Sequence, residues 1–163
     1  MSSSKALRYE IFDVFAESPY SGNPLAVVHG AAALDTTTMQ AIAREMNLSE
    51  TAFVLHDAAR DGAHDVRIFT PSHELPYAGH PTLGTAHVLR ELRGGGDAVS
   101  LVLPAGVVPV SADADVWTLT APFTGSPGVR PETMPAASVA ALLGLGPDDL
   151  AGAPFEQAGD DRV

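Results

Sequence analysis

The chain has 163 residues, 45% of them hydrophobic, which is enough for the core of one ordinary domain, or of one domain and part of another, and argues against a disordered chain. Its 20 acidic residues outnumber its 9 basic residues, and the resulting formal charge of −11 argues against nucleic acid as a partner, because no basic cluster is left to neutralise phosphates. The sequence has no cysteine, which excludes disulfides, thiolate metal sites and cysteine-based catalysis.

The N-terminal part of the chain predicts a strand and then a helix. Alternating apolar residues favour a half-buried strand over residues 7–15, and the segment 19–24, which contains Pro and Gly, ends it. A helix follows, in which Met39, Ile42, Ala43 and Met46 share one apolar face. Asp35 or a following threonine suits the N-cap of this helix, and Asn47 suits its C-terminal end.

Two further strands are predicted at residues 52–55 and 66–69. The polar loop between them is rich in Asp, Gly and Ala, which is typical of a hairpin connection. The second strand leads into the turn formed by residues 79–81.

A second helix is expected to begin at Pro81. Proline at the first helical position costs no hydrogen bond, because that N–H would have no partner within the helix. The unpaired N–H groups of residues 82–84 would then point back toward the turn and, with the helix dipole, form a binding place for a carboxylate. His80 would stand beside this anion.

The helix after Pro81 has little continuous polar face and should be largely buried. Gly84 inside it costs up to about 1 kcal/mol relative to alanine, so we expect neighbouring backbone to approach closely there. Glycines at 94–96 end the helix, and strands follow at residues 98–103, 107–110 and 116–120, with a turn at 112–115. One long helix among many short strands predicts an α+β fold in which a sheet wraps around a central helix.

The Gly and Pro content of residues 123–131 is typical of an interdomain connection. We therefore divide the chain into a domain at 1–123, a linker at 124–131 and the incomplete start of a second domain at 132–163. A helix at about 135–143 falls in the last part, where too few residues follow to cover its apolar side. Alternatively, this helix packs back on the first domain as an ordinary C-terminal helix.

The chain shows no sign of a membrane or secretory destination. Its longer apolar runs, such as residues 99–110, are broken by polar residues, Gly or Pro well short of a membrane span. The N-terminal segment lacks the apolar core of a secretion signal. We therefore expect a soluble, cytoplasmic protein with no membrane partner.

Four blocks stand in order along the chain, namely Asp13-Val-Phe, Ser21 to Val28, Met39 to Val54 and Arg67 to Ala86. Together they resemble the N-terminal half of the PhzF-like phenazine-biosynthesis isomerases. The resemblance implies the diaminopimelate-epimerase fold, in which two similar domains each roll a mixed or antiparallel sheet around a central helix. It also implies an active site in the cleft between the domains, with no cofactor and no metal.

The resemblance assigns a catalytic role to Glu50. In the family, the glutamate of this motif is the general acid/base that moves a proton during isomerisation. A carboxylate suits this work when partial burial lets it both accept and return a proton near neutral pH, and Glu50 lies between a helix end and an apolar strand. Without the motif, a glutamate at such a junction would be interpreted as an exposed surface residue.

His80 carries over in the same way, as a catalytic residue that positions the substrate or assists proton transfer. A lone histidine at a helix start is more often a cap or a structural group. Three further candidates, Ser49, Gly79 and Thr82, are expected to contact a substrate carboxylate through hydroxyl or N–H groups. Asn23 is expected to shape or line the cleft as a fourth substrate-binding residue.

Two features near the turn limit the chemistry. His73 and Glu74 lie in the preceding loop, but no second cluster stands at ligand spacing, so we interpret them as solvated loop residues and predict no metal site. Amino-acid racemases and epimerases of the same fold resemble this chain but use a pair of cysteines, the first at the position of Ala78. Because alanine supplies no thiolate, epimerisation by two thiols is excluded.

Members of the family are about twice as long as this chain, and their second half closes the other side of the cleft. We therefore expect the chain to be inactive or nearly so alone, and to need a complementary C-terminal-half polypeptide or a second copy of itself in a homodimer. The favoured function is an isomerase, or its N-terminal subunit, that moves a proton on a small unsaturated carboxylic acid in secondary-metabolite biosynthesis. The alternatives are a non-catalytic binding or assembly subunit and a truncated fragment without a separate role.

Overall fold

The structure is a computed structural model that describes residues 6–93, 96–114, 116–122, 132–149 and 155–157. The chain forms two compact units, Met1–Pro122 and Phe123–Val163. The linker predicted at 124–131 lies outside the described residues. The candidate site belongs to the first unit.

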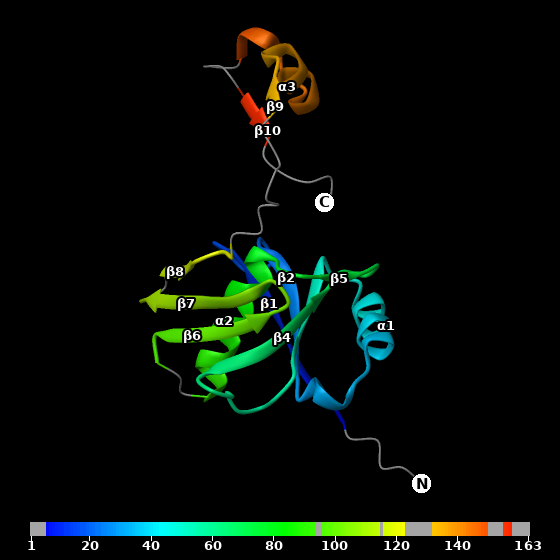
Figure 1. The fold of residues 1–163 in the computed structure, drawn as a ribbon, viewed down its shortest axis with the longest axis vertical. Coiled ribbons are helices and arrows are strands. Elements are labelled where there is room, and N and C mark those ends of the chain that lie inside the picture. Colours follow the sequence, from blue (N-terminus) through cyan, green and yellow to red (C-terminus); the bar gives the residue numbers. More distant parts are fainter. Residues whose placement is uncertain (1–5, 94–95, 115, 123–131, 150–154, 158–163) are drawn as a thin grey trace. The chain divides into compact units, whose positions relative to one another are not determined.

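Among the described residues of the first unit, eight strands form one sheet, in the order β1-β2-β3-β4-β6-β7-β8 with β5 paired to β4 (Figure 1). Neighbours are antiparallel except for β2 with β3 and β4 with β6, which are parallel, so the sheet is mixed as predicted. The strands are β1 (Arg8–Val14), β2 (Asn23–His29), β3 (Glu50–Val54), β4 (Ala63–Phe69), β5 (Glu74–Leu75), β6 (Ala98–Leu103), β7 (Gly106–Asp113) and β8 (Val116–Leu119).

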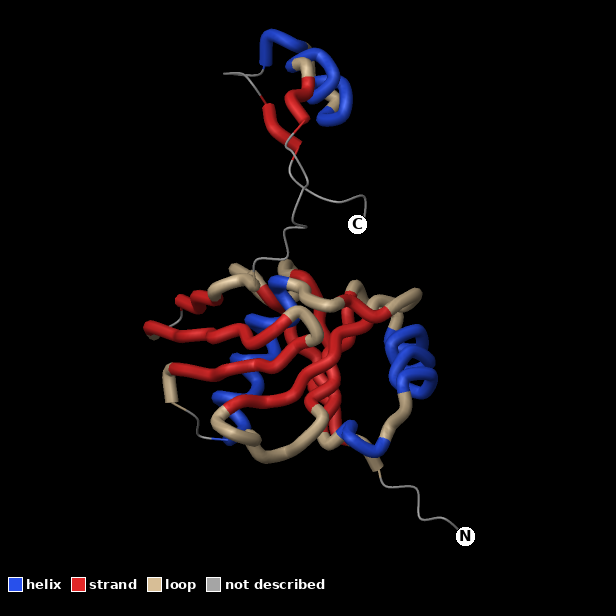
Figure 2. Tube along the Cα trace, in the orientation of Figure 1, coloured by secondary structure: helices blue, strands red, loops and turns tan. Residues whose placement is uncertain are grey.

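The long helix α2 (Gly79–Arg93) lies against the concave face of the curled sheet, and α1 (Thr36–Met46) lies against the opposite face (Figures 1 and 2). A short 3-10 helix, Ala31–Ala33, precedes α1. Side chains alternate along each strand, so each helix contacts its own set of strand residues. The α2 side of the core includes Leu25, Val27, Ala52, Ile68 and Ala86, and the α1 side includes Val28, Met39, Ala43, Phe53 and Phe69.

The predicted ends of α1 are confirmed by its caps. The Asp35 carboxylate accepts a hydrogen bond of 2.7 Å from the N–H of Thr38, and this bond holds the pKa of Asp35 below its ordinary value. At the other end Asn47 takes the left-handed conformation with φ 52°, and its N–H donates to the carbonyl of Ala43. These two caps fix the length of α1 and therefore where the chain turns toward β3.

The prediction that α2 begins at Pro81 is wrong by two residues. The helix begins at Gly79, and the N–H of Thr82 donates to the carbonyl of Ala78 at 3.3 Å. Pro81 is tolerated because an N–H anywhere in the first turn would have no partner within the helix. The free N–H groups at this helix start therefore belong to Gly79 and His80 rather than to residues 82–84.

Gly84 allows the close approach expected of it, but side chains rather than backbone come near. A Cβ at Gly84 would lie 2.6 Å from Cδ2 of Leu25 and 2.8 Å from Cγ2 of Val14. The absence of a side chain at this position lets α2 pack closely against β1 and β2. His80 lies one turn before Gly84. The same close approach therefore helps to set the position of His80 relative to the end of β1 and the start of β2.

Sequence reasoning missed strand β2 altogether. Its centre, residues 25–28, is a continuous apolar run that is buried on both faces, and such a run gives no alternation to detect. The strands predicted at 7–15, 52–55, 66–69, 98–103, 107–110 and 116–120 are confirmed as β1, β3, β4, β6, β7 and β8 with shifted ends.

The second unit contains β9 (Glu132–Met134), α3 (Ala136–Leu143), a 3-10 helix (Pro147–Asp149) and β10 (Phe155–Gln157). The antiparallel pair of β9 and β10 was not predicted, whereas the helix expected at 135–143 is confirmed as α3. In the described parts of the chain, none of the helices has both the length and the apolar character needed to cross a membrane.

Candidate active site

Glu50 is the first residue of β3, and its side chain faces α2. The cap at Asn47 ends α1 three residues earlier and turns the chain into the strand. Along β3, Glu50 lies on the same face as Ala52 and Val54, which pack in the core on the α2 side. The parallel pairing of Glu50 with Leu25 places the carboxylate beside the start of β2.

His80, the second residue of α2, meets this carboxylate. Its Nε2 lies 3.3 Å from Oε2 of Glu50, and the two side chains are 11% and 18% exposed. The orientation of the two atoms does not satisfy hydrogen-bond geometry, and each atom is buried without another hydrogen-bond partner. Catalytic hydrogen bonds are often long or poorly aligned in the absence of substrate. The structure therefore brings the two predicted catalytic residues together, with unused hydrogen-bonding capacity on both.

Burial lowers the pKa of His80 below its ordinary value, and the Coulombic attraction of Glu50 for the charged ring opposes that shift without cancelling it. The imidazole is therefore neutral at pH 7. A neutral imidazole has one nitrogen that donates and one that accepts, so its partners matter.

Asn23 contacts the other side of the His80 ring. It is the first residue of β2, and its Nδ2 lies 3.4 Å from Nδ1 of His80. Asn23 and Glu50 thus approach the imidazole from adjacent parallel strands, one at each ring nitrogen. We call these three residues the Asn23–His80–Glu50 cluster.

The other three predicted substrate contacts differ in their surroundings. Gly79 is exposed at the first position of α2, where its N–H is free to bind an anion, and Ser49 is exposed directly before Glu50. Thr82 is fully buried, and both its hydroxyl (2.7 Å) and its N–H (3.3 Å) donate to the carbonyl of Ala78. This arrangement leaves Thr82 no free donor for a substrate, so the expected contact is not supported.

Tyr77 is a candidate that sequence reasoning did not single out. Its hydroxyl would lie 3.9 Å from a Cβ at Gly79, so a phenol borders the exposed start of α2. Burial raises the pKa of Tyr77, which keeps the phenol protonated and able to donate a hydrogen bond. The feature of the sequence that could have pointed to Tyr77 is its position two residues before Gly79.

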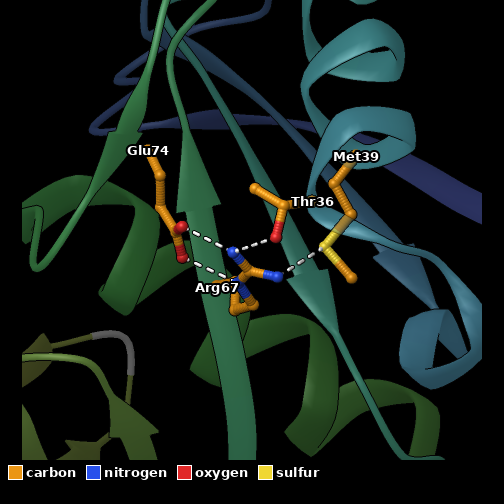
Figure 3. Close-up of polar contacts among 4 residues, drawn as sticks. All are labelled: Thr36, Met39, Arg67 and Glu74. Atoms are coloured by element: carbon orange, nitrogen blue, oxygen red, sulfur yellow. Dashed lines mark hydrogen bonds and ion pairs between the residues drawn. The ribbon is translucent and has the colours of Figure 1, made fainter.

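Glu74 is not the solvated loop residue that the sequence suggested. It lies in β5 and forms an ion pair with Arg67 of β4, with Nε to Oε1 at 2.7 Å and Nη2 to Oε2 at 2.5 Å (Figure 3). The bond to Glu74 raises the pKa of Arg67. The prediction failed because the β4 to β5 pairing, which brings the two residues together, is not visible in a linear pattern.

The same guanidinium also reaches α1. Its Nη2 donates to Oγ1 of Thr36 at 3.0 Å, and Nη1 lies 3.7 Å from Sδ of Met39 (Figure 3). Its central carbon is 5.1 Å from the centre of the Phe69 ring. Arg67 therefore joins α1, which leads to Glu50, with β5, which leads to His80.

Comparison with known proteins agrees with this fold. The sequence model of PhzC-PhzF, described as phenazine biosynthesis-like protein, matches residues 12–159. The chain is 42% identical over 153 residues to an uncharacterized isomerase, mll1393, of Mesorhizobium japonicum, covering 87% of this chain and 48% of that protein. It is 57% identical over 81 residues to the trans-2,3-dihydro-3-hydroxyanthranilate isomerase of Pseudomonas chlororaphis, covering 50% of this chain and 29% of the relative.

Solved structures give the same result. A PhzF-family phenazine biosynthesis protein from Bacillus anthracis superposes with a TM-score of 0.67 at 26% identity, covering 90% of this chain and 50% of the other. The chain therefore belongs to the PhzF-like family, and the predicted α+β epimerase-like fold is confirmed. Some curated relatives align with most of this chain, and the chain spans about half of their length.

Proposed function

We propose that this chain is a PhzF-like isomerase, or the N-terminal part of one, that moves a proton on a small unsaturated carboxylic acid. The observation that carries the proposal is the pair of buried atoms, Oε2 of Glu50 and Nε2 of His80, which lie 3.3 Å apart with no other hydrogen-bond partner. A carboxylate with a neutral imidazole beside it is suited to general acid/base catalysis. Family membership and the named isomerase relatives support the same class of reaction.

In the proposed reaction, Glu50 removes a proton from a carbon next to a double bond. The electron pair of the broken C–H bond forms a new double bond to the neighbouring carbon, the electron pair of the original double bond moves to the far carbon, and that carbon uses it to take the proton back from Glu50. Atoms and charge balance without a cofactor. The ring N–H of His80 lies on the side of Glu50 and holds its carboxyl group in place during the two proton transfers.

The substrate carboxylate is proposed to bind at the start of α2. The N–H groups of Gly79 and His80 precede the first hydrogen bond of the helix, and the helix dipole favours a negative charge there. Ser49 supplies a hydroxyl on the Glu50 side. Asn23 supports the site through His80 rather than by touching the substrate.

We further propose that a second polypeptide, corresponding to the other half of the relatives or to a second copy of this chain, covers the site. The aligned relative mll1393 is about twice as long as the matched region, since the match covers 48% of it. A covered site excludes water, which strengthens the electrostatic interactions of Glu50 and His80.

The test is to incubate the chain in heavy water with trans-2,3-dihydro-3-hydroxyanthranilate, the substrate in the name of the Pseudomonas relatives. The chain is assayed alone and co-expressed with the polypeptide encoded directly downstream. Deuterium at carbon in the recovered acid or its isomer supports the proposal. Binding of the acid without deuterium uptake under both conditions would instead support a non-catalytic binding subunit.

A further inference from the structure

Asn23 and Glu50 make different demands on the ring of His80. The amide nitrogen of Asn23, 3.4 Å from Nδ1, can only donate a hydrogen bond. An ionised Glu50, with Oε2 3.3 Å from Nε2, can only accept one. One neutral form of the imidazole suits both neighbours, namely the form in which Nδ1 accepts from Asn23 and the proton is on Nε2, the nitrogen nearer Glu50.

The opposite tautomer is less favourable in this arrangement. It requires the Asn23 amide to turn over, so that its oxygen accepts from Nδ1–H. The lone pair of Nε2 would then face a carboxylate oxygen at 3.3 Å, and this contact would need a proton on Glu50. Asn23 and Glu50 approach the two ring nitrogens from separate strands, so a small rotation of the ring does not give the opposite tautomer a match to both neighbours.

We propose that Asn23 fixes the neutral imidazole of His80 as its Nε2–H tautomer and thereby keeps the ring proton on the nitrogen that lies beside Glu50. The catalytic consequence rests on the proposed function, but the tautomer is a property of the free protein. Asn23 is then a positioning residue, which acts through His80. The lowered pKa of His80 agrees with this, since a neutral ring is the form in which a tautomer can be selected.

The tautomer is measured directly by two-dimensional NMR of the chain labelled with 15N-histidine, because protonated and unprotonated ring nitrogens resonate in separate regions. The His80→Gln variant assigns the His80 signals. In the unaltered chain above pH 7, Nδ1 should give the unprotonated signal and Nε2 the protonated signal. The reverse pattern would overturn the proposal.

Two variants test the role of Asn23. In Asn23→Asp, which has the same size, the new carboxylate can only accept, so Nδ1 of His80 should become protonated. In Asn23→Ala, the signals should move toward a mixture of both tautomers. His29 is the internal control, because it is buried at the other end of β2 against Glu10, and its signals should stay unchanged if the fold is intact. An unchanged His80 pattern in Asn23→Asp would refute the assignment, whatever Asn23→Ala does.

An activity measurement separates this proposal from the proposed function. If the unaltered chain and its partner exchange deuterium, Asn23→Ala should lower kcat about tenfold or more while KM changes little. A rise in KM with kcat unchanged would make Asn23 a substrate contact instead, which contradicts the proposal. If no exchange occurs in any form, the proposed function fails, and the NMR result still decides the tautomer.

Discussion

Nε2 of His80 lies 3.3 Å from Oε2 of Glu50, although one residue begins a helix and the other begins a strand. The Asn47 cap ends α1 just before β3, and the absence of a side chain at Gly84 lets α2 approach β1 and β2. The contact is therefore a product of the fold on both sides. It places the proposed general acid/base beside a neutral imidazole.

The first prediction concerns the pH dependence of stability. Because the folded-state pKa of His80 is lowered, the unfolded chain takes up its proton first as the pH falls. The free energy of unfolding should therefore fall from about pH 7 to below the ordinary histidine pKa, and His80→Gln should reduce that fall. Urea unfolding at several pH values measures the difference between the two profiles. Parallel profiles would show that His80 is not held neutral by the fold.

The second prediction concerns Gly84. A methyl group there would meet the side chains of buried Leu25 and half-buried Val14 at 2.6 and 2.8 Å, so Gly84→Ala should destabilise the first unit by about 1–3 kcal/mol despite the better helix propensity of alanine. Gly96→Ala is the matched control, because a Cβ at Gly96 meets nothing within 4 Å. Its effect should stay within about 0.5 kcal/mol. Equal effects in urea unfolding would contradict the close approach.

Several elements could be predicted from the sequence because their signals are local. Asp35 and Asn47 end α1 through bonds to residues three or four positions away, and alternation along the chain marks β1. The two catalytic candidates came from a motif, not from geometry. By contrast, the Asn23 to His80 contact spans 57 residues and the Arg67 to Glu74 pair depends on strand pairing, so neither leaves a local pattern.

The third prediction concerns Arg67. Arg67→Met removes two bonds to Glu74 and one to Thr36 and leaves a half-buried carboxylate without its partner, so it should cost about 2 kcal/mol of stability. Arg90→Met is the matched control. Arg90 also forms an ion pair, with Asp97 at 2.9 Å, and lies 5.5 Å from the Trp117 ring, but its carboxylate partner is 71% exposed.

For Arg90→Met we expect a loss of about 0.5–1 kcal/mol, because a pair with an exposed partner contributes little. Urea unfolding of both variants and the unaltered chain measures the two losses. A smaller loss for Arg67→Met than for Arg90→Met would show that the Arg67 contacts do not hold α1 and β5 together.

The fourth prediction concerns Thr82, whose hydroxyl donates to the carbonyl of Ala78 at 2.7 Å. Thr82→Val keeps the shape but loses this bond, so stability should fall by about 1 kcal/mol while KM in the exchange assay stays unchanged. Thr82→Ser keeps the hydroxyl and should retain most of the stability. A tenfold rise in KM for Thr82→Val at unchanged stability would restore Thr82 as a substrate contact.

The most direct test of the account compares two glutamate variants in the deuterium-exchange assay. Glu50→Gln removes the proposed proton carrier with little change in shape, and Glu45→Gln makes the same change at an exposed position on α1. We predict that Glu50→Gln lowers the exchange rate at least about a hundredfold, with its unfolding temperature kept, while Glu45→Gln stays near the unaltered rate. Exchange by Glu50→Gln at the unaltered rate would contradict the central claim that Glu50 moves the proton.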